Sequence, residues 1–374
     1  MSGRVLIVGL GDLGRRYAAA LAARGSIDAL ILAGGGKGKG PAIAGMIESC
    51  HAVPARYVAL DATRQGDVES LLRLERPDLV LQCGSLFSPW EILAGDDPHI
   101  RTIRSAGVAI QLPAQLPILH AVMSAVRTVD LPAPVINLSW PDGTNPIMAR
   151  MGLAPTLGLG NVTMIAQRVR ASLTRDAVEH GRTPHDIPVV RALGDASTLW
   201  AVLSCTPPDN PTEGCRIYLG EEGRRGDEWA YRGDPLESGV HLNELTCASS
   251  VSVIEALLPG GRPVRESCPG VGGLPGGYPI RAGDGRVAFD FPPGVGLEDA
   301  IAFNTSLARE DGIARIESDG TVIYTDHARA VMAAIDPELA EPLAPARAVE
   351  RFPRLIAALT ARRPVTRQRR RGTP

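Results

Sequence analysis

The sequence predicts an α/β fold in which a doubly wound parallel sheet is followed by an α+β domain. Three observations lead to this expectation. Short apolar strands alternate with helices over residues 1–142, as in a parallel sheet covered on both faces. A turn that contains three glycines joins the first strand to the first helix. Beyond residue 143 the helices are longer and the regular alternation ends. We therefore expect two domains, which agrees with a length of 374 residues.

The first domain, expected at residues 1–142, follows from apolar strands that end at turns and from helices whose apolar residues recur at helical spacing. On its first helix, for example, Leu13 and Tyr17 lie on one face. Pro77 and Gly107 end two of the other helices. The expected strands are 4–11, 28–33, 56–61, 78–84 and 133–139, and the expected helices are 12–24, 67–76, 97–106 and 115–129.

The second domain, expected at residues 143–361, combines helices with short strands. Asp319-Gly320 is a turn signal and predicts a hairpin, whereas Pro353 predicts a kink or break in the last helix. Two segments rich in glycine and proline, 206–239 and 259–285, are expected to be a long surface loop and an irregular crossover. The expected helices are 161–179, 240–258, 297–309 and 344–361, and the expected strands are 187–193, 199–205 and 286–291.

Composition and charge exclude several classes of protein. The net charge of −2 gives no overall basic field for nucleic acid. The longest apolar runs are interrupted before the ~18 residues that a membrane span needs. The six cysteines show no metal-type spacing, so we expect reduced thiols, no metal site and a cytoplasmic location. The tail at 362–374 carries six arginines and no apolar core, and we expect it to be disordered.

The glycine-rich turn is the most specific motif in the chain. Gly9, Gly11 and Gly14 form the pattern G-x-G-x-x-G, with Asp12 and Leu13 at the start of the helix. In a Rossmann domain, the first glycine makes a tight turn, the second lets the backbone approach a pyrophosphate, and the third packs helix on strand. The free amide groups of the helix then bind the anion. The alternative is an ordinary tight turn between a strand and a helix.

The residues after the second strand bear on the choice of cofactor. An NAD enzyme places an acidic residue about 20 positions after the fingerprint, where this chain has Ala33. Lys37 and Lys39, the two lysines of the chain, follow directly, and Arg15 and Arg16 begin the first helix. These cations predict a pocket for the 2′-phosphate of NADP. The alternative is a solvated, charged loop.

Three stretches of the chain resemble the lactate/malate dehydrogenase superfamily and, more distantly, the NAD-dependent glycosidases of the same fold. They are LVLQCGSLFSP (79–89), QLPILHAVMSAVRTVDLPAPVINLSWPD (115–142) and GLAPTLGLGNVTMIAQRVR (152–170). The resemblance implies that Gly84 and Ser85 lie in the loop over the nicotinamide, and it adds Ser139 to the cofactor-binding residues. NAD or NADP is therefore the expected cofactor.

The departures from these families affect the expected chemistry. Met164 stands where the dehydrogenases have an aspartate, and Gln167 stands at an arginine position, with Arg168 adjacent. Asp195 falls near the position of their catalytic histidine. Gly160 replaces the cysteine of the glycosidase metal site. Neither the hydroxyacid chemistry nor a metal can therefore be carried over.

The remaining catalytic candidates are His241, Asp195 and Asn161. We expect His241 to be the proton carrier, because an imidazole titrates near neutral pH, and Asp195 to be the alternate. Asn161 is expected to point toward the nicotinamide. Each residue also has a structural alternative: Asn161 as a helix cap, Asp195 as a turn residue, and His241 as a surface or capping residue. Asp142 is expected at the carboxyl edge of the sheet, where ligands bind.

Together these features favour a cytoplasmic oxidoreductase that prefers NADP(H). It would act on a carbonyl, imine, hydroxy or amino group of a small polar metabolite and use an arginine to bind an acid group. Two alternatives stay open, both favoured by the missing His–Asp pair. One is a redox-neutral lyase, isomerase or glycosidase-like enzyme with bound NAD(P), and the other is a protein that senses NADP(H) without turnover. We expect a homodimer with no nucleic-acid or membrane partner.

Overall fold

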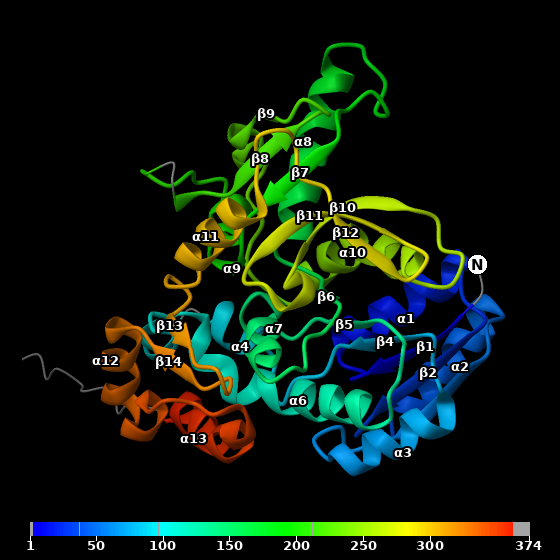
Figure 1. The fold of residues 1–374 in the computed structure, drawn as a ribbon, viewed down its shortest axis with the longest axis vertical. Helices are drawn as coiled ribbons and strands as arrows, with labels where there is room; N and C mark the ends of the chain where they lie inside the picture. The colour runs from blue at the N-terminus through cyan, green and yellow to red at the C-terminus, as the bar shows by residue number, and fades with distance from the viewer. Residues whose placement is uncertain (1–2, 37, 96, 211–212, 362–374) are drawn as a thin grey trace, which may run out of the picture.

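A computed structural model gives the structure of residues 3–36, 38–95, 97–210 and 213–361. Lys37, which was expected to bind the cofactor, and the arginine-rich tail at 362–374 lie outside these described residues. The described chain is built around one parallel sheet, to which smaller antiparallel sheets and a C-terminal helical segment are added (Figure 1).

The parallel sheet has six strands in the order β3-β2-β1-β4-β5-β6. This is the strand order of the doubly wound dinucleotide-binding fold, so the predicted fold class is confirmed. The sheet continues past residue 142, because its last strand pairs Ile136 with Leu157. The strands are β1 (Arg4–Val8), β2 (Ala29–Gly34), β3 (Ala55–Ala59), β4 (Leu79–Gln82), β5 (Val135–Asn137) and β6 (Leu157–Gly158).

Helices cover both faces of this sheet, because alternate strand residues point to opposite sides. Leu6 and Val8 belong to the core on one face, and Val5 and Ile7 to the core on the other. The first face is covered by α3 (Gln65–Glu75) and α6 (Leu112–Thr128), and the second by α1 (Asp12–Arg24), α2 (Gly40–His51) and α10 (Leu242–Ala256). A 3-10 turn at Val108–Gln111 precedes α6. Helix α6 begins at Leu112, three residues before the expected start at residue 115.

Val108–Thr128 is long and apolar enough to cross a membrane by length and composition, but 89% of its most apolar window is buried inside the molecule. Core helices of globular proteins pass the same test.

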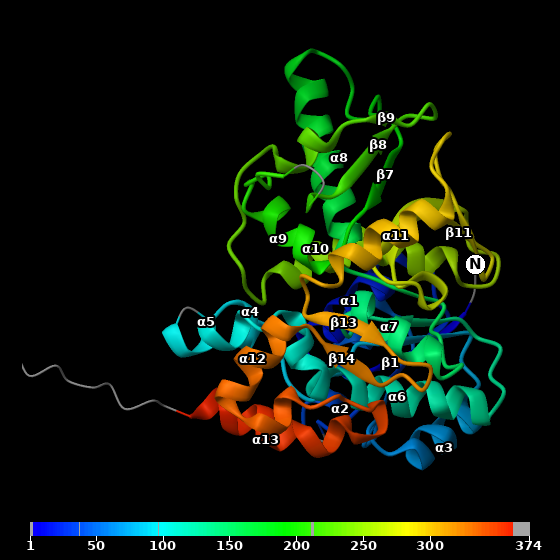
Figure 2. The same ribbon diagram turned by 60° about the vertical axis from the view of Figure 1, so that its left-hand side comes forward.

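The C-terminal segment returns to the parallel sheet. It consists of β13 (Ile313–Ile316), β14 (Val322–Tyr324), α12 (Asp326–Ile335) and α13 (Ala348–Thr360). Leu355 and Ala358 of α13 share one core with Leu116 of α6 (Figure 2). Helix α13 runs through Pro353 without a break, although this proline removes one backbone hydrogen bond.

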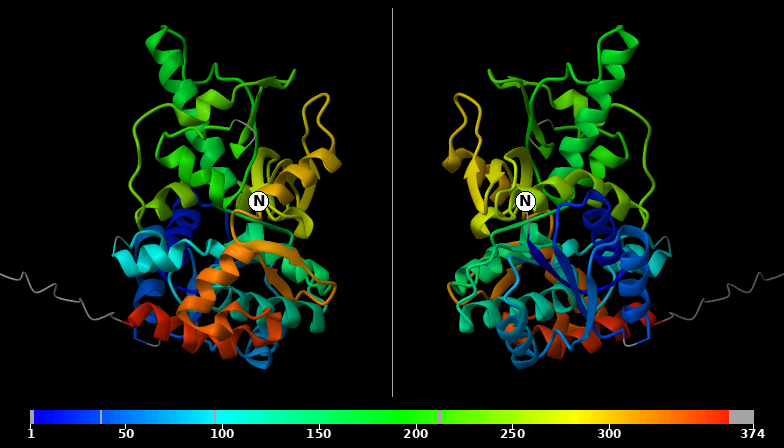
Figure 3. Two further views of the ribbon diagram at one scale, coloured as in Figure 1. Left: turned by 90° about the vertical axis from the view of Figure 1, so that its left-hand side faces the viewer. Right: turned by 90° about the vertical axis from the view of Figure 1, so that its right-hand side faces the viewer.

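Figure 3 shows the part of the chain between β6 and the C-terminal segment on one side of the molecule and the C-terminal helices on the opposite side, where α13 packs on α6. The part after β6 has its own core, between α8 (Val162–Glu179) and a three-stranded antiparallel sheet. That sheet contains β7 (Val190–Leu193), β8 (Arg216–Leu219) and β9 (Arg224–Arg225). Residues 206–239 are therefore not one long loop, as the sequence had suggested.

Residues 199–205 were predicted to be a strand, and this prediction is wrong. They lie in α9 (Ala196–Leu203) and the turn that follows it. Asp195 caps this helix by accepting a hydrogen bond from the Thr198 amide (3.0 Å), and the Thr198 side chain bonds back to the Asp195 amide (2.9 Å). This capping box starts a helix although the residues that follow are apolar and bulky.

Residues 259–285 form two strands of a second antiparallel sheet rather than an irregular crossover. The strands are β10 (Val264–Pro269) and β11 (Gly277–Gly283), and β12 (Arg286–Phe289) completes the sheet. The glycines serve the turn between β10 and β11, where Gly270, Gly272 and Gly273 all have positive φ. The remaining helices are α4 (Trp90–Leu93), α5 (Pro98–Arg104), α7 (Pro141–Arg150) and α11 (Leu297–Leu307).

Candidate functional site

A cavity of about 1040 Å³ runs along the carboxyl ends of the parallel strands. Its walls include the turns after β1, β2, β3, β4 and β5, and it is closed by residues of α8, α9 and α10. Open α/β sheets bind their ligands in this position. The volume is at the upper end of the ~300–1,000 Å³ that is typical of small-molecule sites.

The glycine fingerprint has the geometry that a pyrophosphate requires. Gly9 has φ +96°, and a Cβ there would lie 2.5 Å from Gly84 Cα. A Cβ on Gly14 would lie 2.0 Å from the Gly9 carbonyl oxygen. In contrast, a Cβ on Gly11 would meet no atom within 4 Å, so the space in front of this residue is open. The cradle therefore fits the phosphates of a dinucleotide at the N-terminus of α1.

Asp12 and Leu13, expected near the cofactor, both line the cavity. The Asp12 carboxylate accepts hydrogen bonds from Arg16 Nε (2.8 Å) and from Asn243 Nδ2 (3.0 Å). Partial burial raises the pKa of Asp12, but the bonds from Arg16 and Asn243 outweigh it and hold the pKa below its ordinary value. The guanidinium of Arg16 thus neutralises a carboxylate close to the expected phosphates.

The other end of the cavity lies at β2 and β3. Gly35, Gly36 and Lys39 line it, and no acidic residue of β2 stands among the described residues there. Lys39 is also the N-cap residue of α2, and its side chain is exposed. Asp61, which follows β3, also lines this end, and its carboxylate accepts hydrogen bonds from Thr63. Sequence reasoning missed Asp61.

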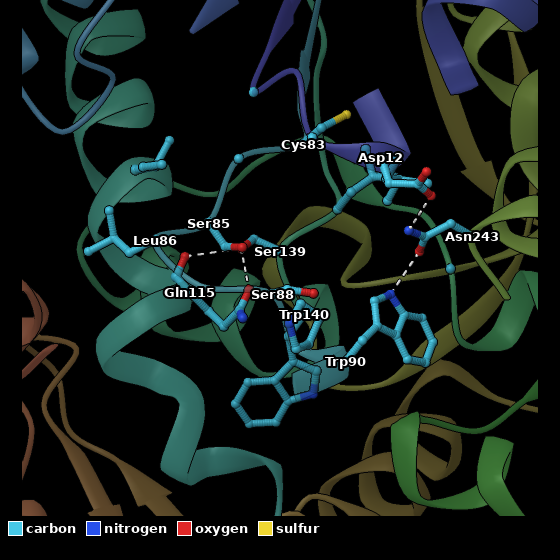
Figure 4. A pocket seen from close by; sticks show the side chains of 18 of the residues that line it. Asp12, Cys83, Ser85, Leu86, Ser88, Trp90, Gln115, Ser139, Trp140 and Asn243 are labelled. Carbon is cyan, nitrogen blue, oxygen red and sulfur yellow. Dashed lines mark hydrogen bonds between the residues drawn. The ribbon is translucent and has the colours of Figure 1, made fainter. Parts of the chain in front are cut away.

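The loop after β4 and the turn after β5 form the middle of the cavity. Gly84, Ser85 and Ser139, all expected near the cofactor, line it. The Gly84 amide donates to Gln82 Oε1 (2.6 Å), which fixes the start of the loop. Figure 4 shows Ser139, whose hydroxyl donates to Gln115 Oε1 (2.6 Å). Burial raises the pKa of the nearby Cys83 thiol well above its ordinary value, so this thiol stays protonated.

Asn161, which was expected to point toward the nicotinamide, lines the cavity at the start of α8. Its backbone has φ 38° and ψ −96°, which is rare for a residue with a side chain. Its amide donates to Asp142 Oδ2, and Asp142 Oδ1 has no partner. Burial, assisted by the Asp195 carboxylate, raises the pKa of Asp142 to about 7. Asp142 lies behind Asn161 and is not part of the cavity wall.

Asp195 does not line the cavity, although its neighbour Ala196 does. Its side chain is 1% exposed and caps α9. Burial raises the pKa of Asp195, against the hydrogen bonds from Thr198 and Ser197 that lower it. Asp311 is a third buried carboxyl, whose pKa is raised by burial and then by Asp195 and Asp142. Asp195 therefore has a structural role in this geometry.

The assignment of His241 as proton carrier is not supported by its position. His241 is exposed and is not part of the cavity wall. Helix α10 begins at Leu242, so the residues that it turns toward the cavity are Asn243 and Thr246. The expected arginine is also missing from the described wall, because Arg168 points to the Asp234 carbonyl oxygen (2.7 Å).

Several residues that the sequence did not single out form the rest of the wall. Trp90 and Trp200 meet edge to face with their ring centroids 6.3 Å apart. The Trp90 indole donates to Asn243 Oδ1 (3.1 Å), so Trp90, Asn243 and Asp12 form one chain of hydrogen bonds (Figure 4). The only available signal was the small number of tryptophans, four in the chain. Within residues 3–361 that are described, no group of His, Cys, Asp or Glu side chains could hold a metal ion.

The fold and the cavity define the protein as one with a dinucleotide-binding fold of the lactate/malate dehydrogenase type. Two solved structures are similar to it. The malate dehydrogenase from Aeropyrum pernix has a TM-score of 0.50 and 14% identity, with 90% of this chain and 100% of that chain covered. MGS-M5, a lactate dehydrogenase from a Medee basin deep-sea metagenome library, has a TM-score of 0.48 and 13% identity, with 83% and 96% covered. The similarity to the malate dehydrogenase and the strand order confirm the fold resemblance expected from the sequence. No protein-family model matches the sequence, and no curated protein is similar enough to count as a relative.

Proposed function

We propose that this protein is an NADP(H)-dependent oxidoreductase that acts on a carbonyl or imine, or on the corresponding alcohol or amine. One observation carries the proposal. A single cavity connects the open space at Gly11 with the side chain of Asn161, which belongs to the other part of the chain. A dinucleotide laid along the strand ends would bring its reactive ring to the wall where a substrate can meet it.

The residues of the cavity suit such a cofactor. The amide groups at the start of α1 would bind the pyrophosphate, with Gly11 giving the necessary space. Lys39 and the N-terminus of α2 would attract a 2′-phosphate, and the loop at Gly84 and Ser85 would hold the nicotinamide. When bound, the nicotinamide supplies hydride transfer.

In this proposal the protein positions the substrate through the Asn161 amide and does not supply a general acid. Asn161 has one amide hydrogen engaged by Asp142 and a second that can donate to the reacting oxygen or nitrogen. The bond to Asp142 fixes the orientation of this amide. The described wall has Asp12, Lys39, Asp61 and Cys83 as its titratable residues. Hydrogen bonds from Arg16 and Asn243 hold the pKa of Asp12 below its ordinary value, and burial raises the pKa of Cys83 well above its own, so neither group is suited to exchange a proton near neutral pH. We infer that water admitted to the cavity supplies the proton that balances hydride transfer.

Two measurements test the proposal. Calorimetry should show that NADPH binds, and more tightly than NADH. Absorbance of the reduced cofactor should then fall when a suitable carbonyl compound is added. Failure of both nucleotides to bind would overturn the proposal.

A second candidate is favoured by the absence of a His–Asp pair from the described cavity wall. The protein would then use its bound nucleotide without net turnover, either as a redox-neutral enzyme or as a sensor of NADP(H). Tight NADPH binding without a change in cofactor absorbance over a broad carbonyl panel would support this candidate instead.

A further inference from the structure

One part of the cavity wall is made of large apolar side chains, which we call the apolar wall. Trp90 and Leu93 come from α4, Trp200 comes from α9, and Val240 comes from the segment that leads into α10. The first three are half-buried, and Val240 is 50% exposed. Because these side chains line the cavity and are not closed off from it, a ligand in the cavity can contact them directly.

Three contacts bring the members of the apolar wall together, although they come from distant parts of the chain. The rings of Trp90 and Trp200 meet edge to face, with their centroids 6.3 Å apart. The Trp90 indole donates to Asn243 Oδ1 (3.1 Å), which joins α4 to the start of α10. The Ser238 hydroxyl donates to the Leu93 carbonyl oxygen (3.3 Å), two residues before the last member of the wall. The four side chains therefore belong to one region of the cavity.

The polar side chains next to the apolar wall are engaged with the protein itself. Asn243 uses both ends of its amide, toward Trp90 and toward Asp12. The Thr246 hydroxyl donates to the Leu242 carbonyl oxygen (3.2 Å). The described residues of α4, α8, α9 and α10 that line the cavity include no charged side chain. A charged group of a ligand would lose its water here without finding a partner, whereas an apolar group would be stabilised by burial.

We propose that the substrate carries a bulky hydrophobic group, either an alkyl chain of several carbons or an aromatic ring, and that the apolar wall binds this group. Ligand pockets are lined mainly by apolar and aromatic side chains, with a few polar groups that fix the orientation. Asn161, which lines the same cavity, would then hold the reacting oxygen or nitrogen. This inference rests on the proposed function, because it assigns the glycine-rich part of the cavity to the nucleotide. It replaces the small polar metabolite expected from the sequence by a larger hydrophobic compound.

A homologous series of methyl ketones tests the inference. We titrate 2-butanone, 2-pentanone, 2-hexanone and 2-heptanone, by ligand-detected NMR, into the protein saturated with NADP⁺, which cannot reduce them. Each added CH₂ group should tighten binding by up to about fourfold, which corresponds to ~0.8 kcal/mol. We expect 2-heptanone to bind at least about tenfold more tightly than 2-butanone. A smaller gain, or a loss of affinity, overturns the inference.

Two variants connect the gain in affinity to the apolar wall. Val240→Asp places a carboxylate at a half-exposed position, where it should not disturb folding, and Trp200→Ala removes one ring. Each should reduce the gain from 2-butanone to 2-heptanone below about threefold. A larger remaining gain in either variant, with the fold intact by circular dichroism, means that the ketones bind elsewhere and overturns the inference.

Val349→Asp is the matched control for these variants. Val349 is exposed to a similar degree (47%), lies on α13 and does not line the cavity. This variant should keep the full gain in affinity along the ketone series. Loss of the gain in Val349→Asp would show that the gain does not depend on the apolar wall, which also overturns the inference.

The nucleotide-free protein separates this inference from the proposed function. If 2-heptanone binds at least about tenfold more weakly once NADP⁺ is bound, the apolar wall holds the nicotinamide ring. The inference is then overturned, and the proposed function stands. If NADP⁺ does not bind at all, the proposed function fails. The ketone series on the nucleotide-free protein and its variants then decides the inference by the same criteria.

Discussion

The side-chain amide of Asn243 donates a hydrogen bond to the Asp12 carboxylate, with Nδ2 and Oδ2 3.0 Å apart. Asp12 belongs to the glycine fingerprint, and Asn243 lies on α10, more than 200 residues later in the chain. Asn243 also accepts from the Trp90 indole (3.1 Å). One amide therefore connects the expected phosphate site, the aromatic wall and a helix of the other part of the molecule.

Replacing Asn243 by leucine should weaken both stability and cofactor binding. The change keeps the side-chain size but leaves the Trp90 indole unpaired and removes one donor from Asp12. We expect the free energy of unfolding to fall by about 1–3 kcal/mol, as measured by denaturant titration. Glu244→Gln, on the exposed side of the same helix, should change it by less than about 1 kcal/mol. Equal effects of the two variants would contradict the role given to Asn243.

The glycines of the fingerprint should respond differently to alanine. Gly14→Ala should lower the melting temperature strongly, because the new methyl group would meet the Gly9 carbonyl oxygen at 2.0 Å. Gly11→Ala should fold normally, since its φ of −66° suits alanine and the space is open. It should weaken NADPH binding by about tenfold or more, or ~1.4 kcal/mol, by filling the place of the pyrophosphate. Unchanged NADPH affinity in folded Gly11→Ala would show that no pyrophosphate binds there.

Lys39 should determine much of the preference for NADPH over NADH. Lys39→Ala removes an ammonium group next to the expected 2′-phosphate, and the Lys37→Ala/Lys39→Ala double variant should remove most of the preference. Charge-assisted contacts of this kind contribute on the order of 1–3 kcal/mol. Calorimetry with both cofactors measures the difference. Arg73→Ala, which removes a cation far from the cavity, serves as the control. Unaltered discrimination in the double variant would exclude a phosphate-binding role for the lysines.

The buried carboxyl of Asp142 predicts a dependence of stability on pH. Its pKa is raised from 3.8 to about 7, so the folded protein holds a proton that the unfolded chain releases near pH 4. The stability contribution is therefore fully present below pH 4 and is lost as the pH rises to about 7. The Asp142→Asn variant has no carboxyl group at this position, so the pH-dependent loss of stability is absent from it. Its stability relative to the parent protein should rise by roughly 3 kcal/mol between pH 5 and pH 8.

The exposed Asp209 gives the matched control for this measurement. Asp209→Asn should leave the pH profile of unfolding unchanged. A flat difference between Asp142→Asn and the parent protein over the same range would mean that Asp142 is ionised in the folded state at low pH.

The part of the fold that could be predicted is the part encoded locally. The glycine fingerprint, the strands around it and α8 depend on residues next to each other in the sequence, and their limits are close to those expected. Helix α9 also had a local signal, Asp195 and Thr198 at capping-box spacing, but the apolar run that follows resembles a strand. The capping box of Asp195 and Thr198 therefore outweighed the strand-like apolar run, and the segment folds as a helix.

The glycine-rich end of the cavity was predictable from the sequence, and the end formed by α9 and α10 was not. The first depends on backbone geometry, which glycines reveal. The second depends on which side of α10 faces the cavity, and each residue turns the helix by about 100°. His241 precedes this helix, and Asn243 follows its first residue. The expectation thus fell two residues away from a side chain that lines the cavity.

The packing of α13 against α6 sets an order of events during synthesis of the chain. The six strands of the parallel sheet are complete once residue 158 has left the ribosome. The side of α6 that Leu355 covers stays uncovered until about 200 further residues have been made, which takes roughly 10–40 s at usual rates of translation. For that interval the nascent protein carries an uncovered apolar helix, which is a surface that molecular chaperones hold. The exposure ends only when α13, the last helix of the described residues, has been made.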